Sequence, residues 1–179
     1  FGEKQIRLLK IADLEEFLTA QTQGFEDALD AIFASCGSSC PKGGTAKLYD
    51  RLAKRVESEP IGSGDLTLGP AELATAAISA TYSPDEGPAF AEALTEAEDG
   101  DPSALLNLAD RYYGGAEYTP YLAIECIDQA HPDGDKEWAE FVARLEKASP
   151  RLGGSIGNEL LPCANWPVKP VEPRPFPKA

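Results

Sequence analysis

Four cysteines limit most strongly the folds that this sequence can adopt: Cys36, Cys40, Cys126 and Cys163. They lack the paired C-x-x-C spacing of a zinc site, and the single histidine, His131, is a poor fourth ligand. An even number without metal spacing favours two disulfide bonds over free buried thiols. Three pairings are open in principle, and closeness along the chain favours Cys36–Cys40 with Cys126–Cys163. The second bond would stabilise the fold by about 3–4 kcal/mol in the chain-entropy model.

Disulfides and charge together indicate where the protein works and what it does not bind. Two disulfides predict an oxidising compartment, so we expect a secreted or cell-envelope protein. The net charge of −14 argues against nucleic acid and against an anionic membrane surface as partners. No apolar run is long enough to span a bilayer. The chain starts at Phe1 and contains no methionine, from which we expect a processed or excised piece.

Apolar residues recur at steps of three and four in most of the chain, which predicts amphipathic helices. We expect a first helix over 13–36, a short helical turn near 156–161, and a loop over 58–69. The first helix carries its apolar face at Phe25, Ala28, Leu29, Ile32, Phe33 and Cys36. No segment alternates with a period of two, so no strand is predicted, and the ambiguous residues 123–128 are assigned to a helix. The other expected helices carry the stripes Leu48–Val56, Leu73–Ala80, Phe90–Ala97, Leu105–Tyr112 and Trp138–Leu145.

These segments predict an all-α fold, an irregular bundle of about six to seven helices cross-linked by disulfide bonds. From Pro162 onward, closely spaced prolines predict an extended path. We therefore expect a helical domain over 1–167 and an extended, proline-rich linker over 168–179.

Three local patterns suggest chemistry that their surroundings do not support. Gly153–Gly157 matches G-x-S-x-G, a pattern that can hold a nucleophilic serine. No strand is predicted before it and no histidine follows Ser155, so a turn is expected here instead of a nucleophile. His131 lies in a turn-rich segment and is expected to be a solvated loop histidine. Residues 133–135 are too few for a calcium loop. The sequence thus predicts no catalytic residue, no metal and no cofactor.

A further pattern, over residues 99–115, resembles one Sel1-type helical repeat. A repeat protein needs at least three copies at a fixed period, and no second copy is present. A free-standing, secreted α-helical module that binds proteins through this helix pair is the alternative interpretation of the chain.

Four motifs, taken in order, resemble a known family. They are Phe25–Ala31 leading into Cys36 and Cys40, Ala104–Tyr113, Ala123–Asp128, and Pro162–Pro167. Together they are similar to the region between the nucleophile and the catalytic aspartate of secreted actinobacterial tripeptidyl-aminopeptidase-like serine hydrolases. That family belongs to the α/β-hydrolases and is related to proline iminopeptidases. The resemblance covers roughly residues 12–170.

The resemblance implies that this chain is a helical cap inserted into a catalytic core that belongs to the same polypeptide. Such a cap covers the active site and restricts the peptide substrates that enter, while the catalytic triad lies outside it. Acidic cap residues are expected to bind the free α-ammonium group of the substrate. On the resemblance, Asp128 is the first candidate and Glu125 the second. The competing interpretation of Asp128 is a carboxylate that caps local backbone.

Overall fold

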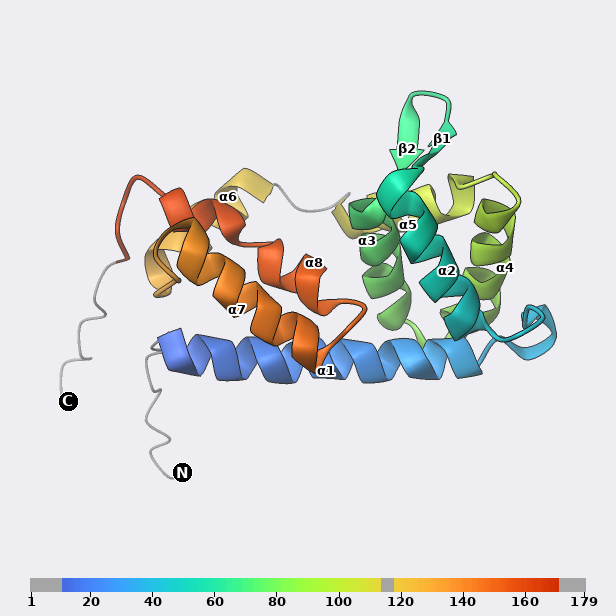
Figure 1. Ribbon diagram of the computed structural model, residues 1–179, viewed down its shortest axis with the longest axis horizontal. Helices are drawn as coiled ribbons and strands as arrows, with labels where there is room; N and C mark the ends of the chain where they lie inside the picture. The colour runs from blue at the N-terminus through green and yellow to red at the C-terminus, as the bar shows by residue number, and fades with distance from the viewer. Residues whose placement is uncertain (1–10, 114–117, 171–179) are drawn as a thin grey trace, which may run out of the picture.

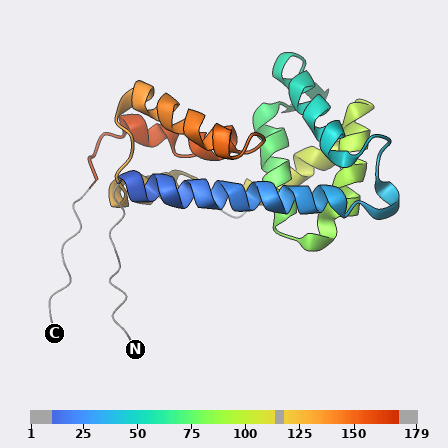
Figure 2. The same cartoon turned by 60° about the horizontal axis from the view of Figure 1, so that its bottom comes forward.

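The computed structural model describes residues 11–113 and 118–170, most of which are helical. Helix α1 (Ile11–Ala34) extends along the long axis, and two groups of helices pack against it, one towards each end (Figure 1; Figure 2). The first group contains α2 (Thr45–Ser58), α3 (Pro70–Thr81), α4 (Gly87–Glu98) and α5 (Ser103–Tyr113). The second contains α6 (Tyr118–Asp128), α7 (Gly134–Ala148) and α8 (Gly153–Asn158). The predicted all-α fold is confirmed, with eight α-helices in the described residues in place of about six to seven.

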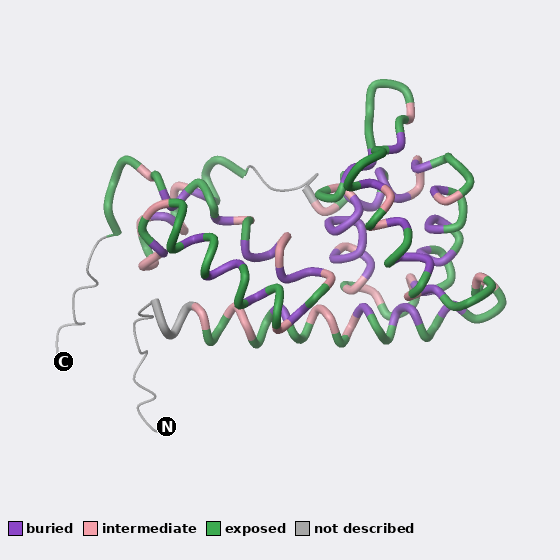
Figure 3. The backbone as a smooth tube through the Cα atoms, viewed as in Figure 1, coloured by how far each residue is buried: buried purple, intermediate pink, exposed green. Residues whose placement is uncertain are grey.

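The buried residues form two hydrophobic cores, one in each group of helices, and Ile156 of α8 packs into the first core. Figure 3 shows the buried positions on the inward sides of the helices. The first core includes Leu29 from α1 and Phe90 from α4. The second is built around Trp138 and Phe141 of α7. Helix α1 contributes to both, because Leu18 near its start packs against the second core. Burial of these aromatic and aliphatic side chains provides most of the stabilisation that holds the helices together.

The first helix lies two residues earlier than predicted, at Ile11–Ala34 instead of 13–36. Its predicted apolar face is confirmed, since Leu29, Ile32 and Phe33 are buried. The helix ends before Cys36, and Gly37 adopts a positive φ of 56°. That conformation is easily reached only by glycine, and it turns the chain into the short 3₁₀ helix η1 (Gly37–Ser39).

The prediction of a structureless loop over 58–69 is wrong in its centre. Strands β1 (Ile61–Ser63) and β2 (Leu66–Leu68) form an antiparallel hairpin, with Ile61 opposite Leu68. Gly64, at the first position of the two-residue turn, has a positive φ of 61°, as a II′ hairpin turn requires. Strands of three residues are too short to show the alternation by which strands are recognised in a sequence.

The end of the described chain is more helical than predicted. Gly153–Gly157, expected to be a turn, lies within α8, and the helical turn predicted at 156–161 therefore starts earlier. The extended path predicted from Pro162 begins later, because Leu161–Asn165 forms the 3₁₀ helix η3. Proline is compatible with the first turn of a helix, where no backbone N–H is needed. Of the predicted linker, residues 168–170 are exposed and without regular secondary structure, and residues 171–179 lie outside the described part.

Both predicted disulfides are confirmed. Cys36 pairs with Cys40 at the end of α1, and Cys126 of α6 pairs with Cys163 of η3 across 37 positions. The second bond is buried in the second core, where it ties α6 to the segment after α8.

Candidate functional site

A cavity of about 540 Å³ lies beside α1, where the two groups of helices meet. Its walls come from α1, α3 and α5 on one side and from α6, α7, α8 and the residues after α8 on the other. A volume of this size is typical of pockets that hold small ligands. Aromatic side chains form much of the surface: Phe17, Phe25, Tyr82, Tyr112, Tyr118, Tyr121, Trp138 and Phe141.

Two carboxylates, Glu125 and Glu159, line this cavity. Glu125 lies on α6, directly before Cys126, and Glu159 follows α8, four positions before Cys163. The disulfide that joins these two segments therefore also fixes the two carboxylates near one another. The hydroxyl group of Tyr118 donates a hydrogen bond to the backbone carbonyl of Glu159 and adds a second link between the segments.

The electrostatics of the pair favour a positive ligand. Burial, and after it the charge of Glu125, raises the pKa of the Glu159 carboxyl above its ordinary value, while a hydrogen bond with Tyr121 acts in the opposite direction. Burial and the same two carboxylates also raise the pKa of the Tyr121 hydroxyl, which stays protonated and can donate. None of the described residues lining the cavity is a lysine or an arginine. A bound cation would thus relieve the repulsion between Glu125 and Glu159.

Two further polar side chains of the lining, Gln129 and His131, interact with Glu125. Gln129 uses its amide N–H to donate to the Glu125 carboxylate, which leaves its own Oε1 buried without a protein partner. His131 donates from Nε2 to the backbone carbonyl of Glu125 at 2.8 Å. In that tautomer Nδ1 is an acceptor, and it too is buried without a protein partner. The two carboxylates of the lining suit a ligand that carries several N–H donors, such as an ammonium group.

The structure separates the two residues predicted to bind an ammonium group. Glu125, the second candidate, lines the cavity and interacts with Gln129. Asp128, the first candidate, is the last residue of α6, is exposed, and does not line the cavity. Glu159, Gln129 and Tyr121 also line the cavity and were not predicted from the sequence. The predicted Cys126–Cys163 bond was a usable signal for Glu159, because it places the neighbours of both cysteines close together.

The expectation of a solvated His131 is wrong. The ring is half-buried and stacks on Trp138 with a centroid distance of 6.0 Å. Trp138 is itself held in place, since its indole N–H donates to the carbonyl of Gly157 at 3.0 Å. These contacts join the loop after α6 to α7 and α8, so His131 forms part of the cavity wall.

The G-x-S-x-G sequence has a packing role in the structure. A Cβ atom on Gly153 would lie 2.3 Å from the backbone oxygen of Leu145, and one on Gly157 would lie 3.1 Å from the Leu145 side chain. Glycine therefore allows α8 to approach α7 closely. His131 is the only histidine in the chain; its Nε2 pairs with the carbonyl of Glu125 and its Nδ1 has no protein partner, so Ser155 and His131 do not form a nucleophile–base pair.

Two other kinds of site are absent from the part of the chain that the structure describes. Within 11–113 and 118–170, no cluster of three or more histidine, cysteine or acidic side chains is arranged to hold a metal ion. Among the same residues, no helix has the length and apolarity needed to cross a membrane.

Comparison with known proteins connects the chain to a peptidase. It is 30% identical over 134 residues to the tripeptidyl aminopeptidases of Streptomyces lividans and Streptomyces coelicolor, a match that covers 69% of this chain. The match covers 24% of each relative, so the chain spans about a quarter of their length. No family model and no solved structure matches. Over most of its length, this chain is related in sequence to a bacterial peptidase.

Proposed function

We propose that this chain is the helical cap of a secreted serine exopeptidase of the α/β-hydrolase type, and that its acidic cavity binds the free N-terminus of a peptide substrate. The observation that carries the proposal is the pair of carboxylates, Glu125 and Glu159, in one cavity whose described lining contains no lysine and no arginine. A peptide α-ammonium group supplies a positive charge and three N–H donors to such a site. The names of the two relatives support an aminopeptidase in particular.

In this proposal, residues 1–167 form the cap and residues 168–179 lead back to a catalytic core in the same polypeptide. The core would provide the nucleophile, the acid and the base, and the cap would hold the substrate at a fixed distance from them. Covering the active site also excludes water from it. Two disulfides suit a protein that works outside the cytoplasm.

The test is steady-state kinetics on the complete polypeptide that contains this chain. Wild-type protein should release short peptides from substrates with a free N-terminus and act poorly on the same substrates after N-acetylation. Loss of one charge-assisted interaction in Glu125→Gln or Glu159→Gln should raise KM for free-amine substrates by about 10- to 100-fold. The effect on kcat should be much smaller, because the interaction exists before the chemical step.

Asp128→Asn is the matched control, since it removes a carboxylate three residues from Glu125 that does not line the cavity. Its KM should stay close to that of the wild type, and Ser155→Ala should retain full activity. Equal hydrolysis of free and N-acetylated peptides would contradict the proposal. A larger rise in KM for Asp128→Asn than for Glu125→Gln would move the ammonium site to the end of α6.

A further inference from the structure

The cavity is much larger than an ammonium group. Treated as a sphere, 540 Å³ corresponds to about 10 Å across, which leaves room for a side chain beside the charged group. The remaining wall is mostly apolar and aromatic. This space bears on the choice of substrate, which the proposed function leaves open.

The two sides of the cavity differ in charge, although aromatic rings line both. Both carboxylates come from the second group of helices and its C-terminal segment. The opposite side comes from α1, α3 and α5 and carries three rings in sequence: Phe25 lies 5.8 Å from Tyr82, and Tyr82 lies 6.1 Å from Tyr112, between ring centroids. We call Phe25, Tyr82 and Tyr112 the aromatic wall. A ligand that fills the cavity therefore has a positive group at one end and an apolar group at the other.

Part of this aromatic surface is exposed to solvent. Tyr82 is 67% exposed, and Phe17, which also lines the cavity, is 53% exposed. Exposed aromatic side chains that gather at the edge of one cavity, instead of being scattered singly, are typical of a binding surface. Covering them with an apolar side chain would remove both the ligand and the rings from water.

We propose that the cavity selects peptides whose N-terminal residue carries a large apolar or aromatic side chain. This proposal depends on the proposed function, because the ammonium group bound by Glu125 and Glu159 fixes the position of the α-carbon. The side chain leaves that same carbon and extends towards the aromatic wall. Glycine leaves the wall exposed, and an N-terminal aspartate or glutamate is repelled by the two carboxylates.

The test is equilibrium binding to the 179-residue chain, measured by calorimetry after circular dichroism has verified that the chain is helical. The ligands are Phe-Ala-NH₂, Leu-Ala-NH₂, Gly-Ala-NH₂ and Glu-Ala-NH₂ with free N-termini, together with N-acetyl-Phe-Ala-NH₂. Phe-Ala-NH₂ and Leu-Ala-NH₂ should bind at least about tenfold more tightly than Gly-Ala-NH₂, and Glu-Ala-NH₂ should bind most weakly of the free amines.

Tyr82→Ala removes the central ring of the aromatic wall at an exposed position, so the fold should persist. It should reduce the preference for Phe-Ala-NH₂ over Gly-Ala-NH₂ to about twofold or less while leaving the affinity for Gly-Ala-NH₂ unchanged. Ile124→Ala is the matched control, because Ile124 is 59% exposed and does not line the cavity. That variant should keep the full preference.

The outcomes distinguish the two proposals. Equal affinity for Phe-Ala-NH₂ and Gly-Ala-NH₂, with weaker binding of the acetylated peptide, would overturn the selection of apolar side chains and leave the ammonium site standing. Equal affinity for Phe-Ala-NH₂ and its acetylated form would overturn the ammonium site instead. Absence of binding by a helical chain would overturn both.

Discussion

At the scale of single residues, Glu159 has the most informative environment. Its carboxyl is partly buried, faces the charge of Glu125, and accepts a hydrogen bond from Tyr121. The net result is a pKa above the ordinary value of a glutamate, which means that the folded protein holds this proton more tightly than the unfolded chain does. A group of this kind is a cost to stability when ionised, and it is retained where a ligand can compensate for it.

The first prediction concerns the pH dependence of stability. Because the pKa of Glu159 is raised in the folded state, its contribution to stability is fully present below the ordinary pKa of 4.5 and is lost as pH rises through the folded value. Glu159→Gln should therefore increase the free energy of unfolding at pH 7, and the difference from wild type should vanish towards pH 4. Urea unfolding at a series of pH values measures this difference. If the difference in free energy of unfolding between Glu159→Gln and wild type grew as pH fell, the raised pKa of Glu159 would be contradicted.

The same shift has a consequence for binding. If Glu159 pairs with a substrate ammonium group, protonation of Glu159 removes that pairing, so affinity should fall as pH drops through its raised pKa. Conversely, a bound cation favours the ionised carboxylate and should release a proton in that pH range.

At the scale of secondary-structure elements, close contact between α7 and α8 explains the glycines that the sequence presents as a catalytic motif. Gly153 allows the start of α8 to lie against the last turns of α7, where a Cβ atom would overlap the backbone of Leu145. Gly24, within α1, is the opposite case, since a Cβ atom there would meet nothing within 4 Å.

The second prediction compares these two glycines. Gly153→Ala should lower the free energy of unfolding by about 3 kcal/mol, because backbone atoms have to move to admit the methyl group. Gly24→Ala should raise it by about 1 kcal/mol, because alanine has the higher helix propensity and no contact opposes it. Chemical denaturation measures both values. A neutral Gly153→Ala variant would show that α8 is not held against α7.

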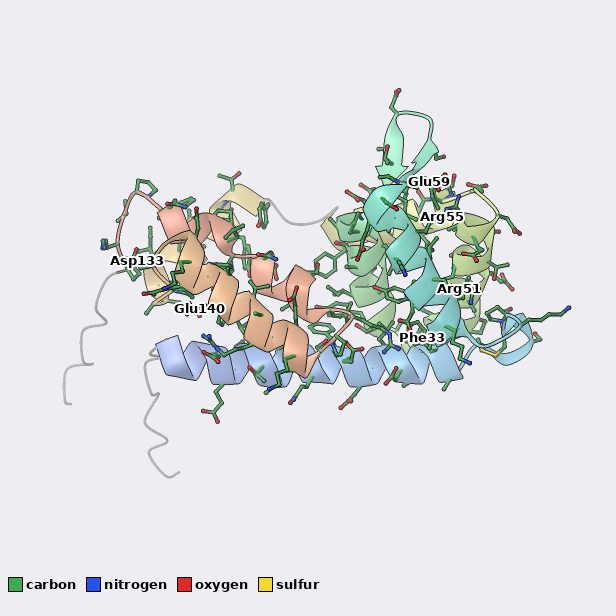
Figure 4. All side chains as sticks on the ribbon, in the orientation of Figure 1. Phe33, Arg51, Arg55, Glu59, Asp133 and Glu140 are labelled. Carbon is green, nitrogen blue, oxygen red and sulfur yellow. A yellow bond between two sulfur atoms is a disulfide. The ribbon has the colours of Figure 1, made fainter. Side chains whose placement is uncertain are left out.

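At the scale of the whole molecule, Arg151 links the second group of helices to the first. It lies in the turn between α7 and α8, and its guanidinium group contacts Glu26 of α1 and Asp50 of α2, each at 2.8 Å. The same group lies 5.5 Å from the ring centroid of Phe33. Figure 4 labels Phe33 on α1. Arg151 is only 24% exposed and Glu26 12%, so this pair is weakly screened by solvent, whereas Asp50 is 51% exposed. They hold together the two groups between which the cavity forms.

The third prediction tests this link. Arg151→Met should lower the free energy of unfolding by about 2 kcal/mol, because it leaves the largely buried Glu26 carboxylate without its positively charged partner. Arg144→Met is the matched control. Arg144 of α7 is 51% exposed and pairs with Glu15 of α1. This substitution should change stability by less than about 1 kcal/mol. Equal losses in the two variants would mean that the Arg151 contacts do not connect the helix groups.

What the sequence alone determined is local in origin. Helical periodicity identified the buried face of α1 at Leu29, Ile32 and Phe33, and the stripes of α2 and α7, because a regular backbone converts spacing into a face. The spacing of the cysteines also led to the correct disulfide pairs, since short separation makes pairing favourable. Some features left no usable local pattern in the sequence. Strand β1 has only three residues, and Gly153 is required by its contact with Leu145 of α7, which is not visible in the residues around it.

Only the tertiary structure decided where the candidate site lies. Its walls combine Phe17 and Phe25 of α1 with Tyr82, Glu125 and Glu159, which are far apart in the sequence and meet because two groups of helices pack against one long helix. The exposure of Asp128 and the burial of Glu159 depend on that packing and not on residue type. Periodicity predicts which face of a helix is buried, whereas a cavity exists where the packing of several helices leaves space. That space depends on long-range contacts, which the order of residues does not display.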